Sequence, residues 1–270
     1  MAVAGVPGAV RTWRKPPFIA DARLRWALWL GAAVYLAAAL GTLDVNWNRV
    51  AEGVPRLVRF LAAFFPPDFA SRWGDIQDGI LESLWMTVTS TVVGIALSIP
   101  FGLGAARNLS PMPVYLVCRA VVALSRTFPE VILAIFFVKL FGFGPFAGFL
   151  ALSIGTIGFY GKLLAEDIED MDPAQAEAVR ATGASWFQWL NYAVLPQVLP
   201  RMVGLGLYRL DINFRESAVV GIVGGGGIGA TLLTAFDRYE YDSAAAILLI
   251  IIGIVMAVEY TSGWVRRKVQ

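Results

Sequence analysis

The sequence predicts an all-α polytopic membrane protein with about six transmembrane helices. Hydrophobic residues make up 57% of the 270 residues and charged residues only 16%, whereas soluble domains hold about 45–50% apolar and about 25% charged residues. The mean hydropathy is +0.65, and the apolar residues gather in runs long enough to cross a bilayer. Because basic residues lie at both ends of the chain, we expect the N- and C-termini to be cytoplasmic.

Residues 1–79 are expected to form a cytoplasmic tail, the first transmembrane helix and an outer amphipathic segment. A basic tail precedes an apolar run over residues 26–43, which is too long for the core of a signal peptide. Residues 47–65 carry apolar side chains at helical spacing with arginines on the other face. That pattern predicts an interfacial helix on the far side of the membrane, which Pro66 and Pro67 end.

Residues 80–264 are expected to hold the other five transmembrane helices, and residues 265–270 a cytoplasmic tail. The predicted helices cover residues 80–106, 114–141, 146–165, 199–223 and 243–264. The first of these five carries a face of threonine, serine and glycine that suits close helix packing. The second is expected to break near Phe128 and Pro129, because proline removes a backbone hydrogen bond.

Several kinds of chemistry are excluded by residue usage. The chain has one cysteine, Cys118, and no histidine, which rules out an intrachain disulfide and a cysteine-based metal cluster. The commonest metal ligand and general base is also missing. We therefore expect no metal site, no catalytic residue and no cofactor bound by this chain, and a lipid bilayer rather than nucleic acid as its environment.

Residues 166–197 form the longest polar stretch after the first helix, and we expect a cytoplasmic loop there. Its apolar residues recur at helical spacing, namely Val179, Trp186, Phe187, Leu190 and Val194. Gly183 is expected to divide the loop into two short helices. Their apolar face either enters a groove of a partner or folds back on the membrane surface, and composition leaves both interpretations open.

The spacing within this loop resembles the coupling-loop motif of ABC importer permeases. That motif reads Glu-Ala-Ala, three residues, Gly, nine residues, Ile, one residue, Leu-Pro. The matching positions here are Glu177, Ala178, Gly183, Leu195 and Pro196. Two positions depart from the motif, since Val179 replaces the second alanine and Ala193 replaces isoleucine. Both replacements are apolar and keep the face intact.

A wider resemblance, from the second predicted helix onward, is to the phosphonate-uptake permease family, whose branch includes phosphite and hypophosphite importers. The segments that carry it are 105–108, 141–148, 181–184, 194–200, 208–209, 212–213, Arg215 and 224–229. The resemblance implies a type I ABC importer core like that of methionine permeases, in the bacterial inner membrane.

The resemblance also implies partners. The short helix that starts near Asp172 would dock in a cleft of a nucleotide-binding subunit, and ATP-driven closure of two such subunits would switch access by rigid-body movement. ATP and Mg would bind on that other chain, because this sequence has no Gly-x-x-x-x-Gly-Lys-Ser/Thr loop. A periplasmic or lipid-anchored binding protein would deliver substrate, and one coupling loop per chain fits a homodimer.

The predicted helix over residues 199–223 contains polar and charged residues that membrane spans seldom hold. They are Arg209, Asp211, Asn213, Arg215 and Glu216. A charge near mid-membrane costs at least about 2.5–3.5 kcal/mol, so such groups usually face a cavity or each other. Asp211 and Arg215 have the spacing of a helical ion pair, and Arg126 and Glu130 repeat that spacing in reverse order.

Two interpretations of these charges remain open. The pairs can neutralise each other and hold helices together. Alternatively, Arg209 or Arg215 lines a translocation path and lowers the barrier for an oxyanion, which the planar fork of arginine fits well.

The glycine run over residues 224–229 contains a Gly-x-Gly-x-x-Gly-like pattern. A dinucleotide site would need a βαβ unit around it, and this run instead follows a predicted membrane helix. The resemblance places the run by the outer gate and the binding protein. The candidate gate residues are Gly224, Gly225, Gly226, Gly227 and Gly229, and a plain tight turn is the alternative.

The leading functional hypothesis is a permease subunit of an ATP-driven importer for a small phosphorus oxyanion, namely phosphonate, phosphite or hypophosphite. One alternative is an ABC permease for an amino acid such as methionine. Another is a secondary transporter driven by an ion gradient, which would not need the coupling loop. An intramembrane enzyme is disfavoured, because the sequence shows no spaced metal ligands and no nucleophile–base pair.

Overall fold

The computed structural model describes residue 19, residues 21–43 and residues 46–269, with side chains up to residue 264. The basic residues Arg11, Arg14 and Lys15 lie outside the described residues, as do the side chains of Arg266, Arg267 and Lys268. The cytoplasmic placement of both termini therefore stays a prediction.

The chain forms two compact units, residues 1–59 and residues 60–270. The first holds α1 (Ala22–Thr42) and most of α2 (Trp47–Ala62). Asp21 caps α1, because its side chain accepts the backbone N–H of Arg23 at 2.8 Å. The apolar side chains of α1 are exposed along its length, as suits a helix whose solvent is lipid.

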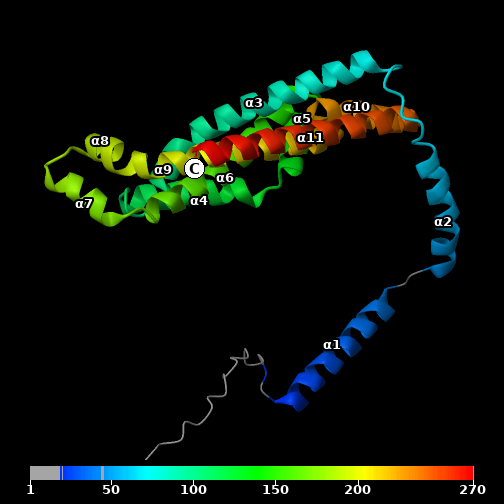
Figure 1. The fold of residues 1–270 in the computed structure, drawn as a ribbon, viewed down its shortest axis with the longest axis horizontal. Coiled ribbons are helices and arrows are strands. Elements are labelled where there is room, and N and C mark those ends of the chain that lie inside the picture. Colours follow the sequence, from blue (N-terminus) through cyan, green and yellow to red (C-terminus); the bar gives the residue numbers. More distant parts are fainter. Residues whose placement is uncertain (1–18, 20, 44–45, 270) are drawn as a thin grey trace, which may run out of the picture. The chain divides into compact units, whose positions relative to one another are not determined.

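The second unit is a bundle of helices. In chain order these are α3 (Trp73–Gly104), α4 (Met112–Thr127), α5 (Glu130–Phe141), α6 (Pro145–Glu169), α7 (Pro173–Ala181), α8 (Trp186–Trp189), α9 (Leu195–Val220), α10 (Ile228–Asp237) and α11 (Tyr241–Val269). Two π-helical turns, Leu190–Val194 and Gly221–Gly225, flank α9. In Figure 1, α7 and α8 extend beyond one end of the bundle, and α10 lies toward the other end.

The described residues contain four helices long and apolar enough to cross a membrane: α1, α3, α6 and α11. Two further spans arise if each bent helix pair counts as one. These pairs are α4 with α5, bent by 88°, and Trp186–Gly225 with α10, bent by 55°. The prediction of an all-α polytopic protein with about six spans is confirmed.

The predicted break at Phe128 and Pro129 is confirmed. Both residues have extended backbone conformations between α4 and α5. Proline biases the preceding residue away from the helical region, so α4 ends at Thr127. The chain then turns and α5 starts at Glu130.

The small polar face of α3 packs against α6, as predicted. A Cβ added at Gly94 would lie 2.5 Å from Thr156 Cβ and 3.0 Å from Ser153 O. Ser98 Oγ donates to Thr156 O at 3.3 Å. Small residues thus let the two helix backbones approach closely where no hydrophobic effect drives association.

Two features of the helices differ from the prediction. α10 occupies a stretch for which the sequence suggested only a glycine-rich segment. The second loop helix, α8, is not separated from the following span by a loop. The helical backbone continues from Trp189 through the π turn Leu190–Val194 into α9. Pro196 directly follows this π turn, in which the N–H of Leu195 donates to Leu190 O five residues back, so the helix is widened where proline offers no N–H.

Candidate functional site

The loop that carries the predicted coupling motif begins with a capped helix. Asp172 Oδ1 accepts the N–H of Ala174 at 3.0 Å and so caps α7. The N–H of Asp172 donates to Gln197 Oε1 at 3.0 Å. The start of α7 is therefore tied to the start of α9.

The α7–α8 pair is held as a hairpin around Trp189. The indole Nε1 of Trp189 donates to Ala176 O at 2.9 Å, and the Arg180 guanidinium lies 4.0 Å from the indole ring centroid. Gly183 has φ +80, which glycine adopts without steric cost. Gly183 therefore provides the turn that lets the hairpin close.

The apolar face of this loop divides into two parts. Trp189, Leu190 and Val194 are buried in a core that also includes Leu164 and Ile168 of α6. Three aromatic side chains remain exposed, those of Trp186, Phe187 and Tyr192. The buried part packs on the chain's own core, and the exposed part leaves a surface available for a partner.

Five of the predicted coupling residues lie on or beside this hairpin. Glu177 and Ala178 are exposed on α7, and Gly183 is exposed at the turn. Leu195 is half-buried against the core and Pro196 is exposed at the start of α9. The motif residues thus supply the turn, an exposed helix face and the junction with a membrane span.

Arg209 of α9 joins three helices. Its side chain is only 3% exposed, and Nη2 lies 3.1 Å from Glu130 Oε1 and 3.6 Å from Glu216 Oε2. Its Nε donates to Thr156 Oγ1 at 3.0 Å. A Cβ added at Gly155 would lie 2.5 Å from Glu130 Oε1. The glycine therefore makes room for the pair.

Asn213 extends this network to α3. Its Nδ2 donates to Thr91 Oγ1 at 2.8 Å and to Thr156 Oγ1 at 3.0 Å. Asn213 is fully buried, and its Oδ1 has no hydrogen-bond partner among the described residues. Arg209 and Asn213 together thus connect α3, α5, α6 and α9 through side-chain bonds.

Arg215 lies in a different environment. It pairs with Asp211 at 3.1 Å, as the four-residue spacing predicted. The Arg215 side chain is 57% exposed, whereas that of Asp211 is 9% exposed. The guanidinium therefore projects from the surface of a membrane-crossing helix.

The spacing of Arg126 and Glu130 does not produce a helical pair. The bend between α4 and α5 separates the two residues, so they do not share a helix face. Arg126 is exposed near the end of α4, and Glu130 instead binds Arg209. Because the chain bends at Pro129, two residues four positions apart do not form the ion pair that their spacing predicted.

The glycine segment, residues 224–229, has a closely packed backbone with positive φ at three glycines. Gly224, Gly226 and Gly227 have φ values of +99, +78 and +74. The N–H of Gly144 donates to Gly224 O at 3.0 Å. A Cβ added at Gly229 would collide with Ala218 O.

Tight packing continues on the other side of the segment. A Cβ added at Gly148 of α6 would lie 2.5 Å from Gly225 O. The segment therefore packs against α6 and against the end of α9 at distances that side chains would prevent.

The glycine segment is bonded to α3 by two residues that the sequence analysis did not single out. The N–H of Gly227 donates to Glu82 Oε2 at 2.7 Å, and the N–H of Ile228 donates to Ser83 Oγ at 2.9 Å. The sequence could have pointed to Glu82 as a functional residue, because a carboxylate within an apolar span is rare. Nothing in the sequence points to Thr156, which accepts bonds from both Arg209 and Asn213, since it resembles any small packing residue.

Comparisons with known proteins all match this chain to membrane components of transport systems. Residues 98–270 match the model of the family described as binding-protein-dependent transport system inner membrane component. The phosphate-import permease protein PhnE of Mycolicibacterium smegmatis is 45% identical over 232 residues. That alignment covers 86% of this chain and 44% of the relative, so the chain spans less than half of that protein.

A second relative is matched over most of its length. The phosphite transport system permease protein PtxC of Stutzerimonas stutzeri is 37% identical over 242 residues, which cover 89% of this chain and 87% of the relative. Among solved structures, a chain of the inward-facing MetNI methionine ABC transporter matches with a TM-score of 0.63 and 25% identity. That match covers 71% of this chain and 94% of the MetNI chain.

Proposed function

The chain belongs to the family of binding-protein-dependent transport system inner membrane components, and from this premise we propose that it forms the translocation path for a small phosphorus oxyanion. It is a permease subunit of an ABC importer. The proposed cargo class covers phosphonate, phosphite and hypophosphite. Phosphate joins this class, because the relative with 45% identity is named for phosphate import.

The observation that carries the proposal is the exposed Arg215 on α9. A guanidinium that is 57% exposed within a membrane span is costly against hydrocarbon, so such residues border water-filled cavities or pair with other polar groups. Asp211 neutralises Arg215 only from one side. A face of α9 that borders an aqueous path explains this exposure, and a second copy of the chain would enclose that path.

The polar residues of α9 thus divide into two roles. Arg215 and Asp211 border the path, where the arginine attracts the oxyanion and the aspartate competes with the oxyanion for the guanidinium. Arg209 and Asn213 hold the helices around the path, with Glu130 and Glu216 as the carboxylate partners of Arg209. Arg126, exposed near the bend between α4 and α5, is a second candidate for contact with the path.

The loop and the glycine segment take the remaining roles. The hairpin of α7 and α8 docks on one of two ATP-binding subunits, with the exposed Phe187 as part of the contact. The glycine segment acts as the outer gate, next to a periplasmic or lipid-anchored binding protein. Its packing against α3 and α6 supports a closed arrangement.

A methionine permease is the second candidate, because the fold matches MetNI at 25% identity. The relatives named for phosphate and phosphite are more similar, at 45% and 37% identity. An ion-gradient transporter leaves the coupling hairpin without a role.

The test is reconstitution of the chain with its ATPase and binding protein. We expect at least one of phosphate, phosphonate, phosphite and hypophosphite to stimulate ATP hydrolysis, and methionine to have no effect. Stimulation by methionine alone would replace the proposed cargo class. Uptake that stops with an ionophore but continues without ATP would exclude the ABC mechanism.

A further inference from the structure

The start of α10 lacks a capping side chain of its own. The residue before α10 is Gly227, which has no side chain to accept a bond from the first turn. The first N–H groups of a helix have no partner within the helix. Gly227 and Ile228 are both buried, so their N–H groups need partners within the protein.

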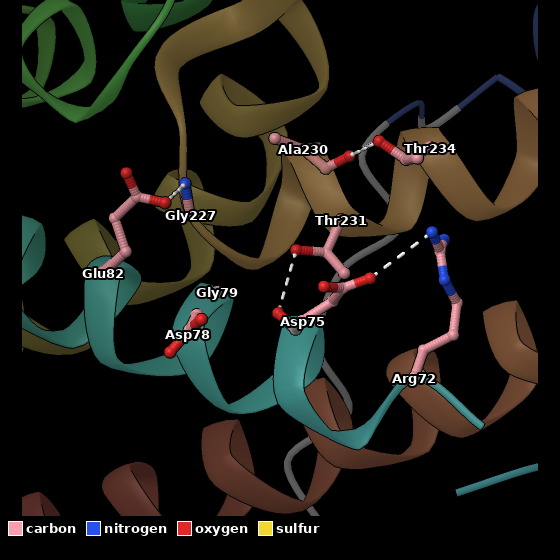
Figure 2. A pocket seen from close by; sticks show the side chains of 9 residues that line it. All are labelled: Arg72, Asp75, Asp78, Gly79, Glu82, Gly227, Ala230, Thr231 and Thr234. Atoms are coloured by element: carbon pink, nitrogen blue, oxygen red, sulfur yellow. Dashed lines mark hydrogen bonds and ion pairs between the residues drawn. The ribbon is translucent and has the colours of Figure 1, made fainter. Parts of the chain in front are cut away.

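Two side chains of α3 provide these acceptors instead. Glu82 accepts the N–H of Gly227 and Ser83 accepts the N–H of Ile228. Figure 2 shows Glu82 extending from α3 to the nitrogen of Gly227. The positive end of the α10 dipole favours a carboxylate at this position, and a charged acceptor makes a stronger bond than a neutral one.

The backbone of the glycine segment is shaped to this contact. A Cβ added at Gly227 would collide with Ser83 Oγ. One added at Gly226 would lie 3.1 Å from Glu82 Oε1 and 2.7 Å from Pro145 N. The segment approaches α3 at a distance that only glycine allows.

Glu82 is separated from the nearby arginine. It lines a pocket of about 270 Å³ between α3 and α10, together with Asp78, Asp75 and Arg72. Arg72 lies at the other end of that pocket (Figure 2) and pairs with Asp75 at 3.4 Å and Glu240 at 3.3 Å. The Glu82 carboxylate is thus directed at the loop backbone, while Arg72 is held by other acids.

We propose that Glu82, assisted by Ser83, is a positioning residue that fastens the glycine segment to α3 and must release it when the outer end opens. This inference rests on the proposed gate role of the segment. The bond joins a rigid span to a segment with three positive φ values. Its loss would free the start of α10 without removing any residue of the segment itself.

The test uses the full chain with its ATPase and binding protein in lipid. Cys118 is replaced by serine and Ala230, in the first turn of α10, by cysteine. The rate at which a charged thiol reagent labels that cysteine reports exposure of the segment. Glu82→Ala removes the acceptor, Glu82→Gln keeps a neutral acceptor, and Asp78→Ala is the control from the same pocket.

We expect Glu82→Ala to raise the labelling rate about tenfold, because a bond to a charged group stabilises by roughly that factor or more. Glu82→Gln should give a smaller rise and Asp78→Ala no change. Equal rates in Glu82→Ala and Asp78→Ala would overturn the inference. Glu82→Gln, which conserves shape, provides the comparison if the alanine variant fails to fold.

A second measurement, of how ATP hydrolysis is coupled to uptake, distinguishes the fastening role of Glu82 from the gate role of the segment. If the segment is the gate, Glu82→Ala should also raise ATP hydrolysis in the absence of binding protein and lower uptake per ATP. Faster labelling with unchanged coupling would keep Glu82 as the fastening residue and overturn the gate role of the segment.

Discussion

Arg209 and Arg215 lie on one helix and yet have opposite surroundings. They are six positions apart, which at 3.6 residues per turn places them on different faces of α9. Arg209 is enclosed by Glu130, Glu216 and Thr156, whereas Arg215 is exposed and has Asp211 beside it. Arg209 therefore has the helix-joining ion pairs of the first interpretation, and the path role of the second is what we propose for Arg215.

Substitution by alanine should separate these two roles. Arg215→Ala should abolish uptake while the chain still assembles with the ATPase. Arg209→Ala should lower stability by about 1.5–3 kcal/mol, because it leaves the half-buried carboxylates of Glu130 and Glu216 without their cation. Thermal unfolding of the detergent-solubilised complex and uptake by proteoliposomes measure the two effects. Normal transport by Arg215→Ala would remove that residue from the path.

Gly227→Ala should destabilise the outer end of the bundle. The residue has φ +74, and an added Cβ meets Ser83 Oγ. The left-handed conformation alone costs a non-glycine residue roughly 1–2 kcal/mol. Gly253→Ala on α11 is the control, since nothing lies within 4 Å of the added Cβ. The melting temperature should fall for Gly227→Ala only, and equal melting temperatures would contradict the packing described for the segment.

At the scale of elements, the sequence predicted the breaks and turns that single proline and glycine residues determine. Proline at 129 predicted the break between α4 and α5, and Gly183 predicted the turn between α7 and α8. α10 was missed because its start is capped from α3, by residues that precede Gly227 by more than 140 positions. The partners of Glu130 likewise depend on how α5 and α9 pack, which no local pattern records.

The hairpin of α7 and α8 allows a matched pair of substitutions. Trp189 is buried and bonded to Ala176 O, whereas Phe187 is 71% exposed. Trp189→Ala should destabilise the chain by about 3–5 kcal/mol, as large-to-small changes in a core do. Phe187→Ala should leave the melting temperature unchanged and reduce copurification of the ATPase subunit. Full copurification of Phe187→Ala would place the docking contact on another part of the hairpin.

At the scale of the whole molecule, the chain exposes one charged and several aromatic side chains that we propose a neighbouring subunit covers. Arg215 is exposed on a span, and the aromatic side chains of the hairpin are exposed at one end of the bundle. A second permease copy would cover Arg215, and an ATPase subunit would cover the exposed aromatic side chains of the hairpin. We propose that the subunit is complete only as an assembly with two permease chains and two ATPases.

The most direct measurement is uptake of a phosphorus oxyanion into proteoliposomes that hold the permease, its ATPase and its binding protein. We predict uptake that requires ATP, persists with an ionophore and disappears with Arg215→Ala. Uptake that proceeds without ATP hydrolysis, or that Arg215→Ala leaves unchanged, would contradict a path for this anion along the exposed face of α9.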